Sequence, residues 1–123
     1  MTEHDEQCAL IEWRNWMCCK DPRIAELFAI PNGGVRPKRT AGRLKAEGME
    51  ASVPDLCLPV AASGYGALWI EMKTDAGRLT PGQQARIDRL NQYGQCAVVA
   101  RGWLEAARQI CAYLSLNAHD FGL

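Results

Sequence analysis

The chain has 123 residues, 48% of them hydrophobic, and its 14 basic and 14 acidic residues give a formal net charge of zero. This length fits a single domain over residues 1–123 with a real hydrophobic core. The zero charge excludes the strong overall positive charge that marks many nucleic-acid binders. The charges are unevenly distributed, however, because acidic residues gather at the start of the chain and basic residues gather between positions 36 and 45.

No apolar run is long enough to cross a membrane, and the polar, acidic N-terminus does not resemble a secretory signal. None of the six cysteines belongs to a C-x-x-C pair, which argues against a zinc site. Most of them lie in apolar stretches, where a free thiol behaves as a small hydrophobe. These features predict a reduced, cytoplasmic protein with no membrane partner.

The first predicted element is a helix over residues 3–19. Its apolar residues recur at helical spacing: Leu10, Ile11, Trp13 and Met17. Thr2 and the acidic residues after it are typical of a helix N-terminus, where negative charge complements the helix dipole. Glu3 and Glu6 therefore either serve this dipole or reach a functional site.

A second short helix is predicted over residues 22–28, because a proline directly after Asp21 suits a first helical position. The next segment is a loop by its Pro, Asn and Gly content, and a further short helix over residues 40–47 is expected to end at Gly48. The basic residues of this region are Arg36, Lys38, Arg39, Arg43 and Lys45. They form either a solvated surface or a strip that contacts phosphates, and the residues alone leave both interpretations open.

Residues 53–73 contain two apolar runs joined by a Gly-containing turn, which predicts two strands. Because side chains alternate along a strand, Trp69, Glu71 and Lys73 share one face of the second strand. Asp55, near the start of the first strand, would cluster with Glu71 and Lys73. Carboxylate oxygens suit Mg²⁺, which lowers the pKa of a bound water and stabilises charge on a phosphoryl oxygen. The alternative is a hairpin in which Glu71 and Lys73 form a solvated edge pair.

A helix over residues 81–93 is predicted from its N-terminal signals. Thr80 is a good N-cap, and Gln83 completes a capping box. Gln83 also lies at the inward end of this helix, so it either serves the cap or faces the site near Asp55.

The apolar run over residues 96–100 predicts a strand buried on both faces. A final helix is indicated over residues 104–114, and residues 117–123 are expected to form a loose tail. This order of elements predicts an α/β fold with a mixed β-sheet flanked by α-helices.

With these residues identified, the chain resembles a VRR-NUC domain, a branch of the PD-(D/E)xK nuclease superfamily. The residues that carry the resemblance are Ile30-Pro31-Asn32-Gly33, Gly48 ahead of Val53-Pro54-Asp55-Leu56, Trp69-Ile70-Glu71-Met72-Lys73, and Arg78-Leu79-Thr80 followed by Gln83. The last group is the most specific, because P-D and E-x-K each occur often by chance. One departure is Ser52, where many members carry Gly, and it matters only if the position demands a positive φ.

The resemblance implies a restriction-endonuclease-like fold with an αβββαβ-type core and phosphodiester hydrolysis that depends on Mg²⁺ or Mn²⁺. The implied metal ligands are Asp55, Glu71, the backbone carbonyl of Met72, and either Glu3 or Glu6. Lys73 matches the catalytic lysine, and Gln83 matches the glutamine of the following helix. DNA contacts are expected from Arg36, Lys38, Arg39, Arg43, Lys45 and Arg78.

Stand-alone members of this size look phage-like and resemble dimeric Holliday-junction resolvases. The expected function is therefore a structure-specific endonuclease on branched DNA, acting as a homodimer with Trp13 and Trp16 as interface candidates. The alternatives are a non-catalytic DNA-binding or assembly module and a nuclease of flaps or single strands. A sequence-specific cleaver is disfavoured because the short chain shows no extra recognition element.

Overall fold

The computed structural model describes residues 1–31 and 38–123. In chain order its elements are α1 (Glu3–Met17), the 3₁₀ helix η1 (Pro22–Glu26), β1 (Phe28–Ala29), α2 (Lys38–Ala46), β2 (Leu56–Leu58), β3 (Leu68–Lys73), α3 (Pro81–Gln92), β4 (Cys96–Arg101), α4 (Trp103–Tyr113) and the 3₁₀ helix η2 (Ala118–Phe121). None of the described helices is both long enough and apolar enough to span a bilayer.

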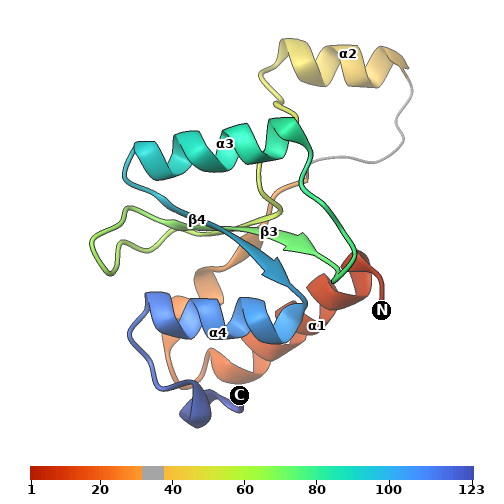
Figure 1. Cartoon of the computed structure of the whole chain (residues 1–123). Coiled ribbons are helices and arrows are strands. Elements are labelled where there is room, and N and C mark those ends of the chain that lie inside the picture. Colours follow the sequence, from red (N-terminus) through yellow and green to blue (C-terminus); the bar gives the residue numbers. More distant parts are fainter. Residues whose placement is uncertain (32–37) are drawn as a thin grey trace.

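The four strands form one mixed sheet in the order β1-β2-β3-β4. The pairs β1–β2 and β2–β3 are antiparallel, whereas β3 and β4 are parallel and are connected through α3. α3 covers one face of this sheet, and α1 and α4 cover the other (Figure 1). The predicted mixed sheet flanked by helices is confirmed. Apart from η1 before β1 and α2 between β1 and β2, the elements from α1 to β4 follow the expected αβββαβ order.

The main core lies between the sheet and the layer formed by α1 and α4. Alternate residues of β3, Leu68, Ile70 and Met72, are all at most 1% exposed and belong to the same apolar cluster as Leu10 and Ile110 from the two helices. Side-chain alternation then leaves Glu71 and Lys73 on the opposite face of β3. The burial of three apolar residues thus fixes the register that places the two charged ones.

The prediction of a helix over residues 22–28 is wrong at its C-terminal end. The 3₁₀ helix stops at Glu26, and Leu27 has extended backbone angles, φ −62° and ψ 126°. Phe28 then pairs with Cys57 as part of the edge strand β1. Backbone pairing with β2 has overridden a weak local preference, because two residues give no periodic pattern from which a strand can be recognised.

The C-terminal tail is ordered rather than loose. Residues 118–121 form η2, and the side chain of Phe121 is only 6% exposed. The indole Nε1 of Trp13 donates a hydrogen bond of 2.9 Å to the carbonyl oxygen of Phe121. A buried indole N–H requires an acceptor, and the tail supplies it, so the end of the chain is tied to α1.

Candidate active site

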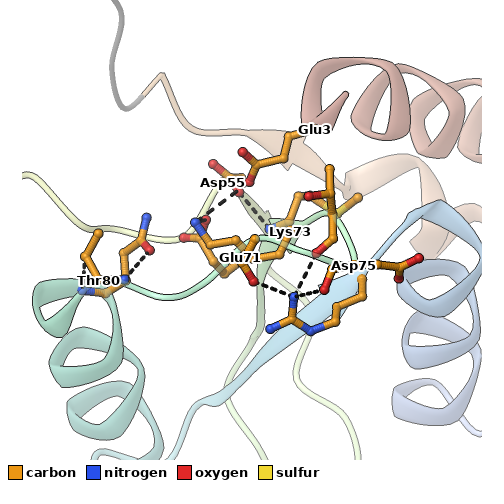
Figure 2. Close-up of polar contacts among 11 residues, drawn as sticks. Glu3, Asp55, Glu71, Lys73, Asp75 and Thr80 are labelled. Carbon is orange, nitrogen blue, oxygen red and sulfur yellow. Dashed lines mark hydrogen bonds and ion pairs between the residues drawn. The ribbon is translucent and has the colours of Figure 1, made fainter. Parts of the chain in front are cut away.

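The carboxylates of Asp55 and Glu71 are brought together by the pairing of β2 with β3. Leu56 lies opposite Ile70 in this antiparallel pair, so the same register carried one step further sets Asp55 opposite Glu71. The Oδ2 atom of Asp55 accepts a 2.7 Å hydrogen bond from the backbone N–H of Met72. This bond fixes the aspartate against the C-terminal half of β3 (Figure 2).

Glu71 is a buried acid with only 3% of its surface exposed. Burial raises its pKa from 4.5 to about 8, and the hydrogen bond and the like charge of Asp55 act in the same direction. The nearby Lys73 ammonium lowers this pKa but does not cancel the other effects. Desolvation and the neighbouring carboxylate therefore outweigh the Lys73 ammonium in setting this pKa.

Lys73 lies between the carboxylates of two different elements. Its Nζ atom is 3.7 Å from Oε2 of Glu71 and 3.8 Å from Oε1 of Glu3, and its side chain is only 10% exposed (Figure 2). The solvated edge pair considered for Glu71 and Lys73 is therefore wrong, because both side chains are buried. An ammonium group in this position can balance negative charge that develops in the site.

The structure places Glu3 and Glu6 differently. Glu3 reaches Lys73, and its charge contributes to the raised pKa of Glu71. Glu6 instead accepts a 2.6 Å hydrogen bond from the backbone N–H of Trp103, the first residue of α4. Its carboxylate thus satisfies an otherwise unpaired amide at a helix N-terminus, where negative charge is also favourable. Of the two glutamates, Glu3 is the one near the carboxylate pair.

The backbone of Met72 presents a third oxygen at the same edge. The N–H of Met72 points to Asp55, while the carbonyl of the next residue, Lys73, accepts a hydrogen bond from Gly102 on the β4 side. Within a strand, the N–H and carbonyl of one residue point to the same edge, and successive residues alternate. The Met72 carbonyl is therefore directed to the edge that carries Asp55.

This donor set fits a hard divalent cation at an open site. Mg²⁺ is held by one or two carboxylates and completes its shell with water and substrate oxygens, and Asp55, Glu71 and the Met72 carbonyl offer oxygens of this kind. Within residues 1–31 and 38–123, no group of three or more His, Cys, Asp or Glu side chains is placed to hold a metal ion, so this donor set has two carboxylates and one backbone carbonyl. A cation held by these oxygens would keep coordination positions for water or substrate oxygens.

The carboxylate pair opens into a cleft of about 1050 Å³ between α1, the β2–β3 edge and the start of α3. Its lining includes Glu3, Asp55, Glu71, Met72 and Gln83. Gln83 takes part in the helix cap and also lies on the wall of the cleft that contains Asp55, so the two alternatives considered for it are both met. Its Oε1 atom accepts a 3.0 Å hydrogen bond from the backbone N–H of Thr80, which completes the capping box, while the residue lies on the cleft wall.

Ser52 lies on the cleft wall in a left-handed conformation, with φ of 69°. The position does demand a positive φ, so serine here carries a backbone strain that glycine would avoid. A Cβ atom on Gly82 would come within 2.6 Å of the Ser52 hydroxyl oxygen. The first turn of α3 therefore packs tightly against the segment that leads to Asp55.

The predicted DNA contacts are exposed where the structure describes them. Arg39, Arg43 and Lys45 lie on α2, which is set apart beyond the start of α3 (Figure 1), and Arg78 lies in the β3–α3 loop. Arg36 falls outside the described residues, and so does the side chain of Lys38. The solvated surface and the phosphate strip both remain compatible with this exposure.

Arg101 is a site-organising residue that the sequence did not reveal. Its Nη1 atom donates to the backbone carbonyls of Thr74, Asp75 and Gly77, which shapes the loop between Lys73 and Arg78 (Figure 2). A basic residue at the end of a strand carries no local signal for such a role, because its partners lie more than twenty positions earlier.

The raised pKa of Glu71 predicts a pH-dependent stability in the absence of divalent cations. A carboxyl group with a raised folded-state pKa binds its proton more tightly in the folded state, so its stabilising contribution is complete below about pH 4.5 and is lost as the pH rises to about 8. We expect Glu71→Gln to remove this decline of the free energy of unfolding with rising pH. The measurement is urea unfolding at several pH values, with a chelator present to remove divalent cations. The exposed Glu105→Gln on α4 is the matched control, and an unchanged pH profile in Glu71→Gln would contradict the assignment.

The two N-terminal glutamates are expected to differ in their effect on stability. Glu6→Ala removes the acceptor at the start of α4 and should lower the free energy of unfolding by about 1–2 kcal/mol, the usual cost of losing a helix cap. Glu3→Ala should change it by less than about 0.5 kcal/mol, because the Glu3 side chain is half exposed. Chemical denaturation of both variants checks this, and a larger loss in Glu3→Ala would be inconsistent with these placements.

The chain is similar to known proteins in both sequence and fold. The VRR-NUC domain family matches residues 5–103. A solved structure described as a VRR_NUC domain protein is similar to this chain at 30% sequence identity and a TM-score of 0.77, covering 95% of this chain and 91% of that one. No curated protein matches the sequence. The match over most of the chain and the shared nuclease-type fold show that this protein belongs to the VRR-NUC family.

Proposed function

We propose that this protein is a metal-dependent, structure-specific DNA endonuclease that hydrolyses phosphodiester bonds. The observation that carries the proposal is the carboxylate pair on the cleft wall, formed by half-buried Asp55 and buried Glu71, with the buried Lys73 ammonium 3.7 Å from Glu71. An acid with a strongly raised pKa, such as Glu71, in a cleft beside a buried cation is typical of catalytic sites. The alternative of a non-catalytic module is disfavoured because all three side chains are present and converge.

Each residue of the site has a distinct task in such a reaction. Asp55, Glu71 and the Met72 carbonyl would hold Mg²⁺ or Mn²⁺, which when bound supplies charge stabilisation at a phosphoryl oxygen and an activated water. Lys73 balances negative charge developing beside Glu71. Glu3 keeps the Lys73 ammonium near the carboxylates through its 3.8 Å contact. Gln83 presents its amide at the cleft wall while its oxygen remains in the helix cap.

DNA is proposed to meet the basic residues of α2, the helix set apart beyond the start of α3 (Figure 1). Arg39, Arg43 and Lys45 are exposed on a short helix that has little packing against the rest of the protein, and residues 47–54 lead from this helix directly to Asp55. Contacts to phosphates would position the backbone without reading its sequence. Arg78, in the loop between β3 and α3, is proposed to add a further phosphate contact.

A homodimer acting on branched DNA is the finer part of the proposal. Each chain has one candidate site, and resolving a four-way junction takes two symmetric cuts, which a twofold dimer supplies. Trp16 supports an interface, because its side chain is 71% exposed on α1. Trp13 does not, because it is 6% exposed and binds the carbonyl of Phe121, so it belongs to the core of its own chain.

Cleavage of a panel of labelled DNAs tests the activity. We expect Mg²⁺ or Mn²⁺ to support cutting of a four-way junction in preference to linear, flap and splayed DNAs. Asp55→Asn, which keeps the acceptor for the Met72 N–H, should lower turnover by at least about a hundredfold, as expected for loss of a metal ligand. Lys73→Met should lower turnover about 10²–10³-fold without weakening metal binding.

Glu105→Gln, on the exposed surface of α4, serves as the control for these variants. Activity that persists in Asp55→Asn would contradict the site. Preferred cutting of flaps or single strands, or a monomeric mass by light scattering, would instead replace the junction and dimer assignments with the flap or single-strand alternative.

The DNA contacts of α2 are tested by the salt dependence of binding. Neutralising a residue that contacts a phosphate should reduce the slope of log affinity against log salt by about 0.9. We expect this from Arg39→Gln, Arg43→Gln and Lys45→Gln, and no change from Arg108→Gln on α4, which covers the opposite side of the sheet from α3 (Figure 1). If the slope of log affinity against log salt is the same in all four variants as in the wild type, the basic residues of α2 form only a solvated surface.

A further inference from the structure

A histidine and a cysteine lie together on the cleft-facing side of α1, apart from the carboxylate pair. His4 and Cys8 are four positions apart, and the Nε2 atom of His4 is 3.5 Å from the Sγ atom of Cys8. Both residues line the same cleft as Asp55 and Glu71. Residues at this spacing lie one above the other on a helix, so the helix itself holds the two donor atoms close.

The distance between the two donor atoms matches that of a metal site. With metal–sulfur and metal–nitrogen bonds of about 2.3 and 2.0–2.1 Å at a tetrahedral angle, the sulfur and nitrogen ligands of one zinc ion are about 3.5 Å apart. In the structure this contact is a hydrogen bond between the two side chains, and a cation held by both atoms would take its place. We propose that His4 and Cys8 bind a thiolate-seeking divalent cation such as Zn²⁺ on the wall of the cleft.

The chemistry of these donors separates this site from the carboxylate site. Imidazole and thiolate favour zinc and its softer neighbours, whereas carboxylate and carbonyl oxygens favour Mg²⁺ and Mn²⁺. The absence of C-x-x-C pairs does not bear on this site, because a helix brings positions i and i+4 together. Among the described residues, no third His, Cys, Asp or Glu side chain completes the pair, so two coordination positions stay open to water or to phosphate oxygens.

Binding requires a proton to leave. The Cys8 thiol gives its proton to solvent, its sulfur forms a bond to the cation, and neutral His4 donates the lone pair of Nε2, so no oxidant or reductant takes part. Because the bound ion would occupy the cleft wall, Zn²⁺ is expected to inhibit the cleavage that Mg²⁺ supports. This regulatory consequence rests on the proposed function, whereas binding of the ion does not.

Titration with Cd²⁺ tests the binding directly, because a cadmium–thiolate bond gives an ultraviolet charge-transfer band and carboxylate coordination does not. We expect the band in the wild-type protein and its loss in Cys8→Ser. In His4→Gln the affinity should fall at least about tenfold, since even indirect partners of a metal ligand contribute that much. Cys19→Ser is the matched control, because Cys19 is also an exposed cysteine but its Sγ atom contacts a backbone carbonyl rather than a histidine.

Loss of the band in Cys19→Ser, or its persistence in Cys8→Ser, would overturn the site. Equal Cd²⁺ affinity in His4→Gln and the wild type would also overturn it. Zn²⁺ inhibition is then measured for the wild type and Cys8→Ser, each against its own activity without Zn²⁺. Equal inhibition in both would overturn the regulatory role. A protein that shows the His4-dependent band but cuts no DNA would contradict the proposed function and leave the metal site standing.

Discussion

The burial of Glu71 beside Asp55 is the constraint on which the arrangement of the site depends. Leu68, Ile70 and Met72 bury one face of β3 in the main core, and the strand's alternation then forces the charged residues onto the other face. Desolvation and the neighbouring carboxylate raise the pKa of Glu71 to about 8. The fold therefore keeps two acids together at a cost in stability that a bound divalent cation would remove.

The elements around this pair act mainly as supports. Glu6 joins α1 to the first amide of α4, and in this way holds the turn of α1 that carries Glu3 over Lys73. The capping box at Thr80 fixes Gln83 at the start of α3, against which the Ser52 segment packs. The strained φ of Ser52, in the segment that leads to Asp55, is consistent with a backbone shaped for a site rather than for stability.

Local and periodic signals in the sequence were sufficient for much of this structure. The capping residues located α3, the alternation along β3 separated its two faces, and the motif residues Asp55, Glu71 and Lys73 do converge. The edge strand at Phe28, the ordered tail and the loop contacts of Arg101 were not predictable, because each depends on a partner distant in sequence. The choice between Glu3 and Glu6 likewise required the position of α4, which helical spacing does not supply.

Calorimetric titration with Mn²⁺ near neutral pH, in two buffers of different ionisation enthalpy, tests the central claim most directly. Because burial and the neighbouring Asp55 carboxylate raise the pKa of Glu71 well above its ordinary value, ligation near neutral pH should release a proton to the buffer. Asp55→Asn should weaken binding strongly, and Glu71→Gln should abolish the proton release. Absence of Mn²⁺ binding, or binding with no proton released and no effect of either substitution, would contradict the assignment of this carboxylate pair as the metal centre.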